Sequence, residues 1–128
     1  MKVKDVEYRD EYVIVNPTEM VKNVSEKVLE GFPAVMAAIV VKEGEPLGII
    51  YLDTVVRHCV IGKKDPFKTP ASQVMDKNIL KVSDQEDIEL VKQRVAQFKP
   101  HGIIVVDDDD AIEGYISPRD WAIIIGVK

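Results

Sequence analysis

A strand passes into a helix at the stretch Gly114-Tyr115-Ile116-Ser117-Pro118-Arg119-Asp120. Ser117 is a good N-cap, and Pro118 suits the first helical position because that position needs no N–H donor. Free backbone N–H groups at such a junction can bind an anion. The Asp120 carboxylate has two acceptor oxygens that can bind the vicinal hydroxyls of a ribose. The alternative is an ordinary helix start, in which Asp120 only completes the cap.

The residues before this junction predict one compact unit of secondary structure. A strand is expected over 79–82, and Ser83-Asp84-Gln85-Glu86 is a capping box that starts a helix. Strands are expected over 102–106 and 112–116, and a closing helix begins at Pro118. The apolar face of the first helix is expected at Ile88, Val91, Val95 and Phe98.

The first half of the chain repeats this order with different residues. A strand over 12–15 leads into the helix start Asn16-Pro17-Thr18-Glu19, and Gly31 ends the helix. Strands over 37–41 and 48–51 and a helix over 53–61 follow. The apolar face of the first helix is expected at Val21, Val24, Val28 and Leu29. The chain therefore divides into a repeat over 1–62, a linker over 63–70 that is rich in Lys and Pro, and a repeat over 71–128.

A repeat of about 60 residues buries too little apolar surface to be stable by itself. We therefore expect an α/β fold in which two β-α-β-β-α repeats pack face to face, with pseudo-twofold symmetry and a cleft between them. The helix that contains Trp121-Ala122-Ile123-Ile124-Ile125 is apolar nearly all round, so one packing face cannot cover it. This predicts a homodimer interface.

Composition narrows the functional classes. With 128 residues, 46% of them hydrophobic and 30% charged, the chain suits one compact unit. Its net charge of −5 disfavours nucleic-acid binding, which normally needs a basic surplus. The longest apolar run, 34–41, is far shorter than the roughly 20 residues that cross a membrane. The single cysteine, Cys59, fits a reducing compartment, so we expect a cytoplasmic protein.

The two repeats resemble the cystathionine beta-synthase (CBS) domain, which occurs in pairs called Bateman modules. Three segments carry the resemblance: the leading residues 71–75, the strand 101–107, and the stretch 114–120, which is similar to the G-x-x-[ST]-x-x-D signature. The resemblance implies a stand-alone regulatory module that binds AMP, ADP, ATP or S-adenosylmethionine in the cleft. It also implies that Asp120 binds ribose, that Ser117 contacts phosphate, and that adenine lies in an apolar slot between the repeats.

Further residues follow from the resemblance, each beside a plainer interpretation. His101 matches a histidine that faces nucleotide phosphates, or it is a surface histidine, and Arg119 pairs with phosphate or is simply solvated. Tyr115 lines the base slot or packs on the sheet. Apolar residues of the first repeat sandwich adenine or belong to the core: Ile14, Val15, Val35, Met36 and Ala37.

The first repeat departs from the signature. Tyr51 stands where Ser or Thr is expected, Thr54 stands where Asp is expected, and Asp53 is one residue early. One residue on a helix is a rotation of about 100°, so Asp53 points away from the required direction. We therefore expect one good nucleotide site per chain, built around Ser117 and Asp120.

Enzymatic alternatives find little support in the sequence. His58 and Cys59 are adjacent and so point in different directions on a helix, and two histidines with one cysteine are too few for usual zinc sites. The run 107–110 lacks the spacing of an EF-hand loop. We expect no catalysis, no metal and no required cofactor. Two hypotheses remain: a sensor of an adenosine ligand that signals to an unidentified protein target, and a ligand-free scaffold for dimerisation or partner binding.

Overall fold

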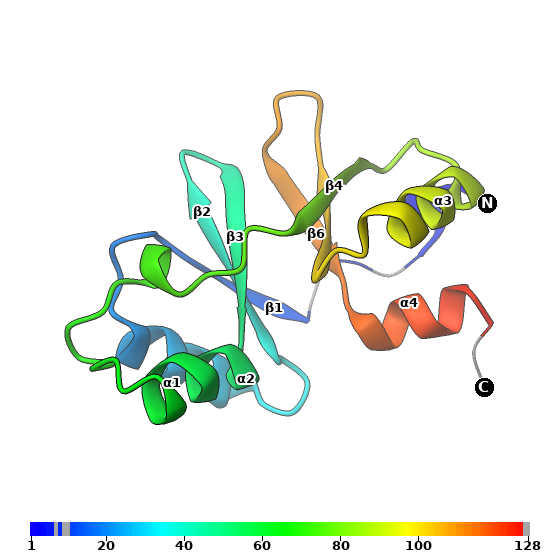
Figure 1. The fold of residues 1–128 in the computed structure, drawn as a ribbon. Helices are drawn as coiled ribbons and strands as arrows, with labels where there is room; N and C mark the ends of the chain where they lie inside the picture. Colours follow the sequence, from blue (N-terminus) through cyan, green and yellow to red (C-terminus); the bar gives the residue numbers. More distant parts are fainter. Residues whose placement is uncertain (7, 9–10, 127–128) are drawn as a thin grey trace.

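The computed structural model describes residues 1–6, 8 and 11–126, which form two three-stranded sheets with their helices (Figure 1). The first sheet has the order β1-β2-β3, and β1 is parallel and β3 antiparallel to the central strand. Its elements are β1 (Tyr12–Val15), α1 (Val21–Gly31), β2 (Ala37–Lys42), β3 (Glu45–Tyr51), α2 (Leu52–Val55) and the π-helical segment η2 (Val56–Ile61), which continues α2.

The second sheet repeats this topology. It has the order β4-β5-β6, again with one parallel and one antiparallel neighbour of the central strand. Its elements are β4 (Ile79–Ser83), α3 (Ile88–Phe98), β5 (Gly102–Val106), β6 (Ile112–Ile116) and α4 (Pro118–Ile124). A short 3₁₀ turn precedes the first strand of each repeat, η1 (Val3–Asp5) and η3 (Ala71–Gln73). The predicted β-α-β-β-α order is confirmed in both halves.

The inner faces of the two sheets pack on each other, and the helices cover the outer faces. Buried residues from both sheets form the inner cluster: Ala37, Ile39, Ile49, Ile104, Val106 and Tyr115. The central strands are rich in Ile and Val, as expected for strands that are covered on both faces. The predicted fold of two repeats packed face to face is therefore confirmed.

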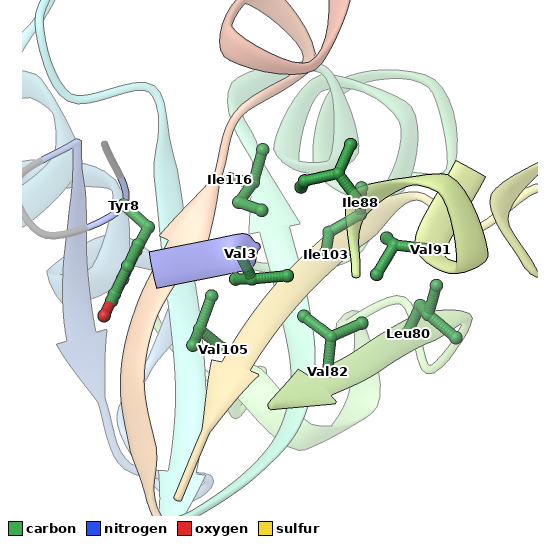
Figure 2. Packing of buried hydrophobic residues seen from close by; sticks show 9 residues of the cluster. All are labelled: Val3, Tyr8, Leu80, Val82, Ile88, Val91, Ile103, Val105 and Ile116. Atoms are coloured by element: carbon green, nitrogen blue, oxygen red, sulfur yellow. The ribbon is translucent and has the colours of Figure 1, made fainter. Parts of the chain in front are cut away.

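Each repeat is completed by the segment that leads into the other repeat. Val3 of η1 is fully buried in the core of the second repeat, where Figure 2 shows it among Val82, Val105 and Ile116. In the same way, Ala71 and Val74 from the segment before β4 belong to the core of the first repeat. We call these two segments, 1–6 with Tyr8 and 70–76, the leading segments.

The exchange explains the glycine of the signature. The Tyr115 N–H donates to the carbonyl of Tyr8 at 2.7 Å, and a Cβ on Gly114 would overlap that carbonyl. In the first repeat the Ile49 N–H donates to the Asp76 carbonyl at 2.9 Å, and a Cβ on Gly48 would lie 2.8 Å from the same oxygen. Glycine therefore lets a leading segment cross closely over the last strand of the opposite repeat.

The predicted starts of α1 and α3 are wrong. The helices begin at Val21 rather than Pro17 and at Ile88 rather than Asp84. The expected side-chain bonds do form, because Asn16 Oδ1 accepts the Thr18 N–H and Glu86 accepts the Ser83 N–H, but they close turns. The residues before the helices then pair in extended conformation with the leading segments, Met20 with Pro70 and Asp87 with Lys2.

Two residues assigned to the apolar helix faces are not buried. Leu29 is 56% exposed and Phe98 is 55% exposed, both in the last turn of their helices. Val21, Val24, Val28, Ile88 and Val91 are buried as predicted.

Candidate functional site

The start of α4 has the predicted cap. Ser117 Oγ accepts the Asp120 N–H at 3.0 Å, and Pro118 occupies the first helical position. The Trp121 N–H donates to the Ser117 carbonyl at 2.8 Å. Ser117 is buried although it is polar, and it lines a cavity.

This cavity, which we call the Ser117 cavity, has a volume of about 290 Å³ and contains side chains from both repeats. The first repeat contributes the residue before β1, the segment before β2 and the end of β3, and the second contributes the end of β6 and the start of α4. Its lining residues are Glu11, Ala34, Met36, Tyr51, Tyr115, Ser117, Pro118 and Arg119. A largely apolar cavity with a few polar groups is typical of a small-molecule site.

Two carboxyl groups and one guanidinium meet beside the Ser117 cavity. Arg119 donates to Glu11 Oε1 at 3.2 Å. Burial raises the pKa of the Asp120 carboxyl above its usual range, and the neighbouring Glu11 carboxylate raises it further. Asp120 does not itself line the cavity, but it contacts Ser117 and Glu11, which do.

A second cavity, the Tyr51 cavity, lies at the corresponding place of the first repeat and has a volume of about 390 Å³. The Thr54 hydroxyl accepts the Tyr51 N–H at 3.2 Å, so Thr54 caps α2. It has no carboxylate with which to bind a ribose as Asp120 could. The cavity is lined by Tyr51, Asp53, Thr54, Arg57, Asp76, His101 and Pro118.

Both basic side chains of the Tyr51 cavity have acidic partners. Arg57 binds Asp53 at 2.5 Å, and the His101 ring contacts the Asp76 carboxylate. Burial of Asp76 acts in the opposite direction, but hydrogen bonds from the Asn78 N–H and from His101 lower the pKa of Asp76 overall. The charges in this cavity are therefore already paired.

Two phenols lie together at the Ser117 cavity. The Tyr51 hydroxyl donates to the His101 carbonyl at 2.5 Å and lies 2.9 Å from the Tyr115 hydroxyl. Burial raises the pKa of Tyr51, and burial together with the neighbouring Tyr51 raises the pKa of Tyr115 strongly. Both phenols are therefore neutral at physiological pH. Tyr51 lines both cavities, so a change in one of them reaches a wall of the other.

The structure brings some of the candidate residues together and separates others. Ser117, Arg119, Tyr115 and Met36 line the Ser117 cavity, with Asp120 behind it. His101 lies in the Tyr51 cavity instead. Val15 and Val35 pack on the helix side of the first sheet, Ala37 lies between the sheets, and Ile14 is half exposed.

Sequence reasoning missed Glu11 and Ala34. Glu11 directly precedes β1, where an isolated acidic residue carries no pattern of its own, and its partner Arg119 is 108 residues away. From sequence, Ala34 only begins an apolar run, 34–41. No cluster of three or more metal-binding side chains occurs among residues 1–6, 8 and 11–126. In the same described part, no helix is long and apolar enough to span a membrane.

The family model for the CBS domain matches residues 3–61 and 71–125. No curated protein matches the chain. Several solved structures match it. The CBS domain pair of protein MJ0100, in complex with 5′-methylthioadenosine and S-adenosyl-L-methionine, has a TM-score of 0.77 at 18% identity and covers 98% of this chain and 96% of its own.

Two further structures are similar over nearly their whole length. A CBS domain protein from Pyrobaculum aerophilum complexed with AMP has a TM-score of 0.77 at 17% identity, covering 99% of this chain and 98% of its own. An uncharacterized conserved protein from Pyrococcus horikoshii has a TM-score of 0.76 at 16% identity, covering 99% and 92%. At these identities the likeness establishes the fold.

Proposed function

The chain belongs to the CBS domain family, and from that premise we propose that it is a regulatory module that binds an adenosine compound in the Ser117 cavity. The observation that carries the proposal is the cavity itself. Side chains of both repeats line it, and it meets the capped start of α4, where Ser117 and Asp120 lie together. Two similar pairs were solved with adenosine compounds, one with AMP and one with 5′-methylthioadenosine and S-adenosyl-L-methionine.

In this proposal the ribose binds beside Ser117 and Glu11, both of which contact Asp120, so that the Asp120 carboxylate accepts from its hydroxyls, and the base occupies the apolar part of the cavity. Its walls include Tyr115 from the second repeat and Ala34 and Met36 from the first. Because these walls belong to different repeats, a ligand that contacts both favours one relative orientation of the repeats. The size of that effect is limited by the difference in its affinity for the two orientations.

The output of such a module passes through another protein or through self-association. Large apolar side chains remain exposed on η2 and α4: Val60 at 71%, Ile61 at 72% and Ile123 at 71%. Neighbouring large apolar side chains that remain exposed, such as Val60 and Ile61, are typical of interaction surfaces. We propose that these exposed side chains of η2 and α4 form a homodimer interface, which sedimentation with and without ligand measures directly. The single cysteine fits function in a reducing cytoplasm.

Replacing Asp120 with Ala tests the ligand role. A hydrogen bond to a charged group contributes about 1.5–3 kcal/mol, so we expect Asp120→Ala to weaken adenosine binding about ten- to a hundredfold in calorimetric titration. Wild type is expected to bind one ligand per chain, because Thr54 replaces the second ribose carboxylate. Thermal unfolding without ligand checks that the variant is folded.

Asp53→Ala is the matched control, because Asp53 is also an acidic residue in the first turn of a helix but lines the Tyr51 cavity. We expect its affinity to equal that of wild type. If neither AMP, ATP, S-adenosylmethionine nor 5′-methylthioadenosine binds to wild type, the module is a ligand-free scaffold and the proposal fails. Equal affinity in Asp120→Ala and wild type contradicts the ribose role.

A further inference from the structure

We infer that the Ser117 cavity selects adenosine derivatives whose 5′ substituent carries no net negative charge, and that Glu11 is the residue that sets this selectivity. The inference rests on the proposed adenosine site and names the class of ligand within it. The preferred substituent is neutral or positively charged, in contrast to the phosphate that the signature around Ser117 suggested.

The first argument is the position of Glu11. Its side chain lines the Ser117 cavity, its Oε1 is 3.2 Å from the Arg119 guanidinium, and it interacts with Asp120. A substituent at the 5′ carbon of a ribose that Asp120 holds therefore lies in the field of both carboxylates. A phosphate there places further negative charge beside them, which is unfavourable in a half-buried cavity.

The second argument is the charge balance. Glu11 and Asp120 each contribute −1 when ionised and Arg119 contributes +1, so these three groups together carry −1. Arg119 is the one basic residue among the described residues that line the Ser117 cavity, and Glu11 already pairs with it. In the neighbouring Tyr51 cavity Arg57 and His101 are also paired with carboxylates. A phosphate has to break one of these ion pairs to gain a cation.

The third argument is the supply of backbone donors at the start of α4. Pro118 has no N–H, the Asp120 N–H donates to Ser117 Oγ, and the Trp121 N–H donates to the Ser117 carbonyl. At most the Arg119 N–H is left in this turn for a ligand. The helix start therefore does not provide the several converging N–H groups that phosphate sites use.

The remaining walls suit an uncharged or cationic group. Ala34 and Met36 are apolar, and the hydroxyls of Tyr51 and Tyr115 bond to each other. A thioether packs against such side chains without a desolvation cost for charge, and a sulfonium gains attraction from Glu11.

Calorimetric titration of wild type and Glu11→Gln with four probes tests the inference. The probes are 5′-methylthioadenosine as the neutral arm, S-adenosylmethionine as the cationic arm, and AMP and ATP as the anionic arm. We expect wild type to bind 5′-methylthioadenosine or S-adenosylmethionine at least about tenfold more tightly than AMP or ATP. Glu11→Gln should shift this ratio about tenfold toward AMP, because it removes one negative charge and keeps the size of the side chain.

Glu45→Gln is the matched control, because it changes the net charge equally while Glu45 pairs with Lys81 outside the cavity lining. It should leave the ratio unchanged. A wild type that binds AMP as tightly as 5′-methylthioadenosine overturns the inference and leaves the adenosine site standing. A ratio that Glu11→Gln does not move overturns the role of Glu11. If no probe binds, the adenosine site and this inference both fail.

Discussion

Gly114→Ala probes the close crossing of the first leading segment over β6. The added Cβ would overlap the Tyr8 carbonyl oxygen and lie 2.9 Å from its carbonyl carbon, so the obstacle is backbone that cannot rotate away. The crossing segment has to move, which weakens the 2.7 Å bond from the Tyr115 N–H and disturbs the packing of buried Tyr8. Overpacking of 1–3 kcal/mol and a weakened hydrogen bond of about 1 kcal/mol sum to about 3 kcal/mol of lost stability. The melting temperature should fall by roughly 10 °C.

Urea unfolding monitored by circular dichroism measures the free energy of unfolding, with Gly126→Ala as the control. A Cβ at Gly126 meets no atom within 4 Å, and only its φ of +78° opposes the substitution, which costs about 1 kcal/mol. Gly114→Ala should therefore be clearly the less stable variant. If the two variants lose equal stability, the crossing at Gly114 has no special energetic role and the reasoning is refuted.

Two further predictions concern the other leading-segment contact and the carboxyl pair. Val3→Ala should lower the free energy of unfolding in urea by about 2 kcal/mol, because Val3 is fully buried in the core of the second repeat. A loss near zero would show that the leading segment does not contribute to that core. For Asp120 the folded-state pKa lies above the unfolded value, so its contribution to stability is most favourable below the unfolded pKa and falls as pH rises through the folded pKa. Asp120→Asn should remove this fall in the free energy of unfolding from about pH 4 upward, as urea unfolding at several pH values measures. If the stability–pH curves of variant and wild type run parallel, the prediction is contradicted. Asp76, whose pKa is lowered, titrates below that window.

Local patterns were enough to predict the order of the elements. Gly31 and Pro118 act through backbone geometry, and the short runs rich in Ile and Val at 37–41 and 102–106 favour buried strands. The same locality explains the predicted cap at Ser117, whose partner Asp120 is three residues away. Repetition of the pattern then implied two halves with a shared cleft.

The features that sequence reasoning missed all depend on residues that are far apart in the chain. Helix starts at Val21 and Ile88 follow from pairing of Met20 with Pro70 and of Asp87 with Lys2, which no local motif encodes. The sequence groups His101 with Ser117 and Asp120 in one nucleotide site, yet in the structure it lines the Tyr51 cavity, against the start of α2 in the other repeat. The role of Glu11 depends on Arg119 and Asp120, which are more than 100 residues away in the chain. Tertiary placement, rather than propensity, decided these positions.

The exchange of leading segments makes folding an all-or-none event for the whole chain. We propose the boundaries 1–62 and 71–128 as units of sequence repetition but not as units that fold alone. A cut within 63–70 would leave Val3 on the first half, away from the core it fills in the second, and Ala71 and Val74 on the second half, away from the core of the first. Such fragments should behave as a complementing pair that folds on mixing and not before. Pairing of Lys2 with Asp87 also closes a very long loop, so the intact chain should fold slowly for its size, with the N-terminal residues docking only after the second sheet exists.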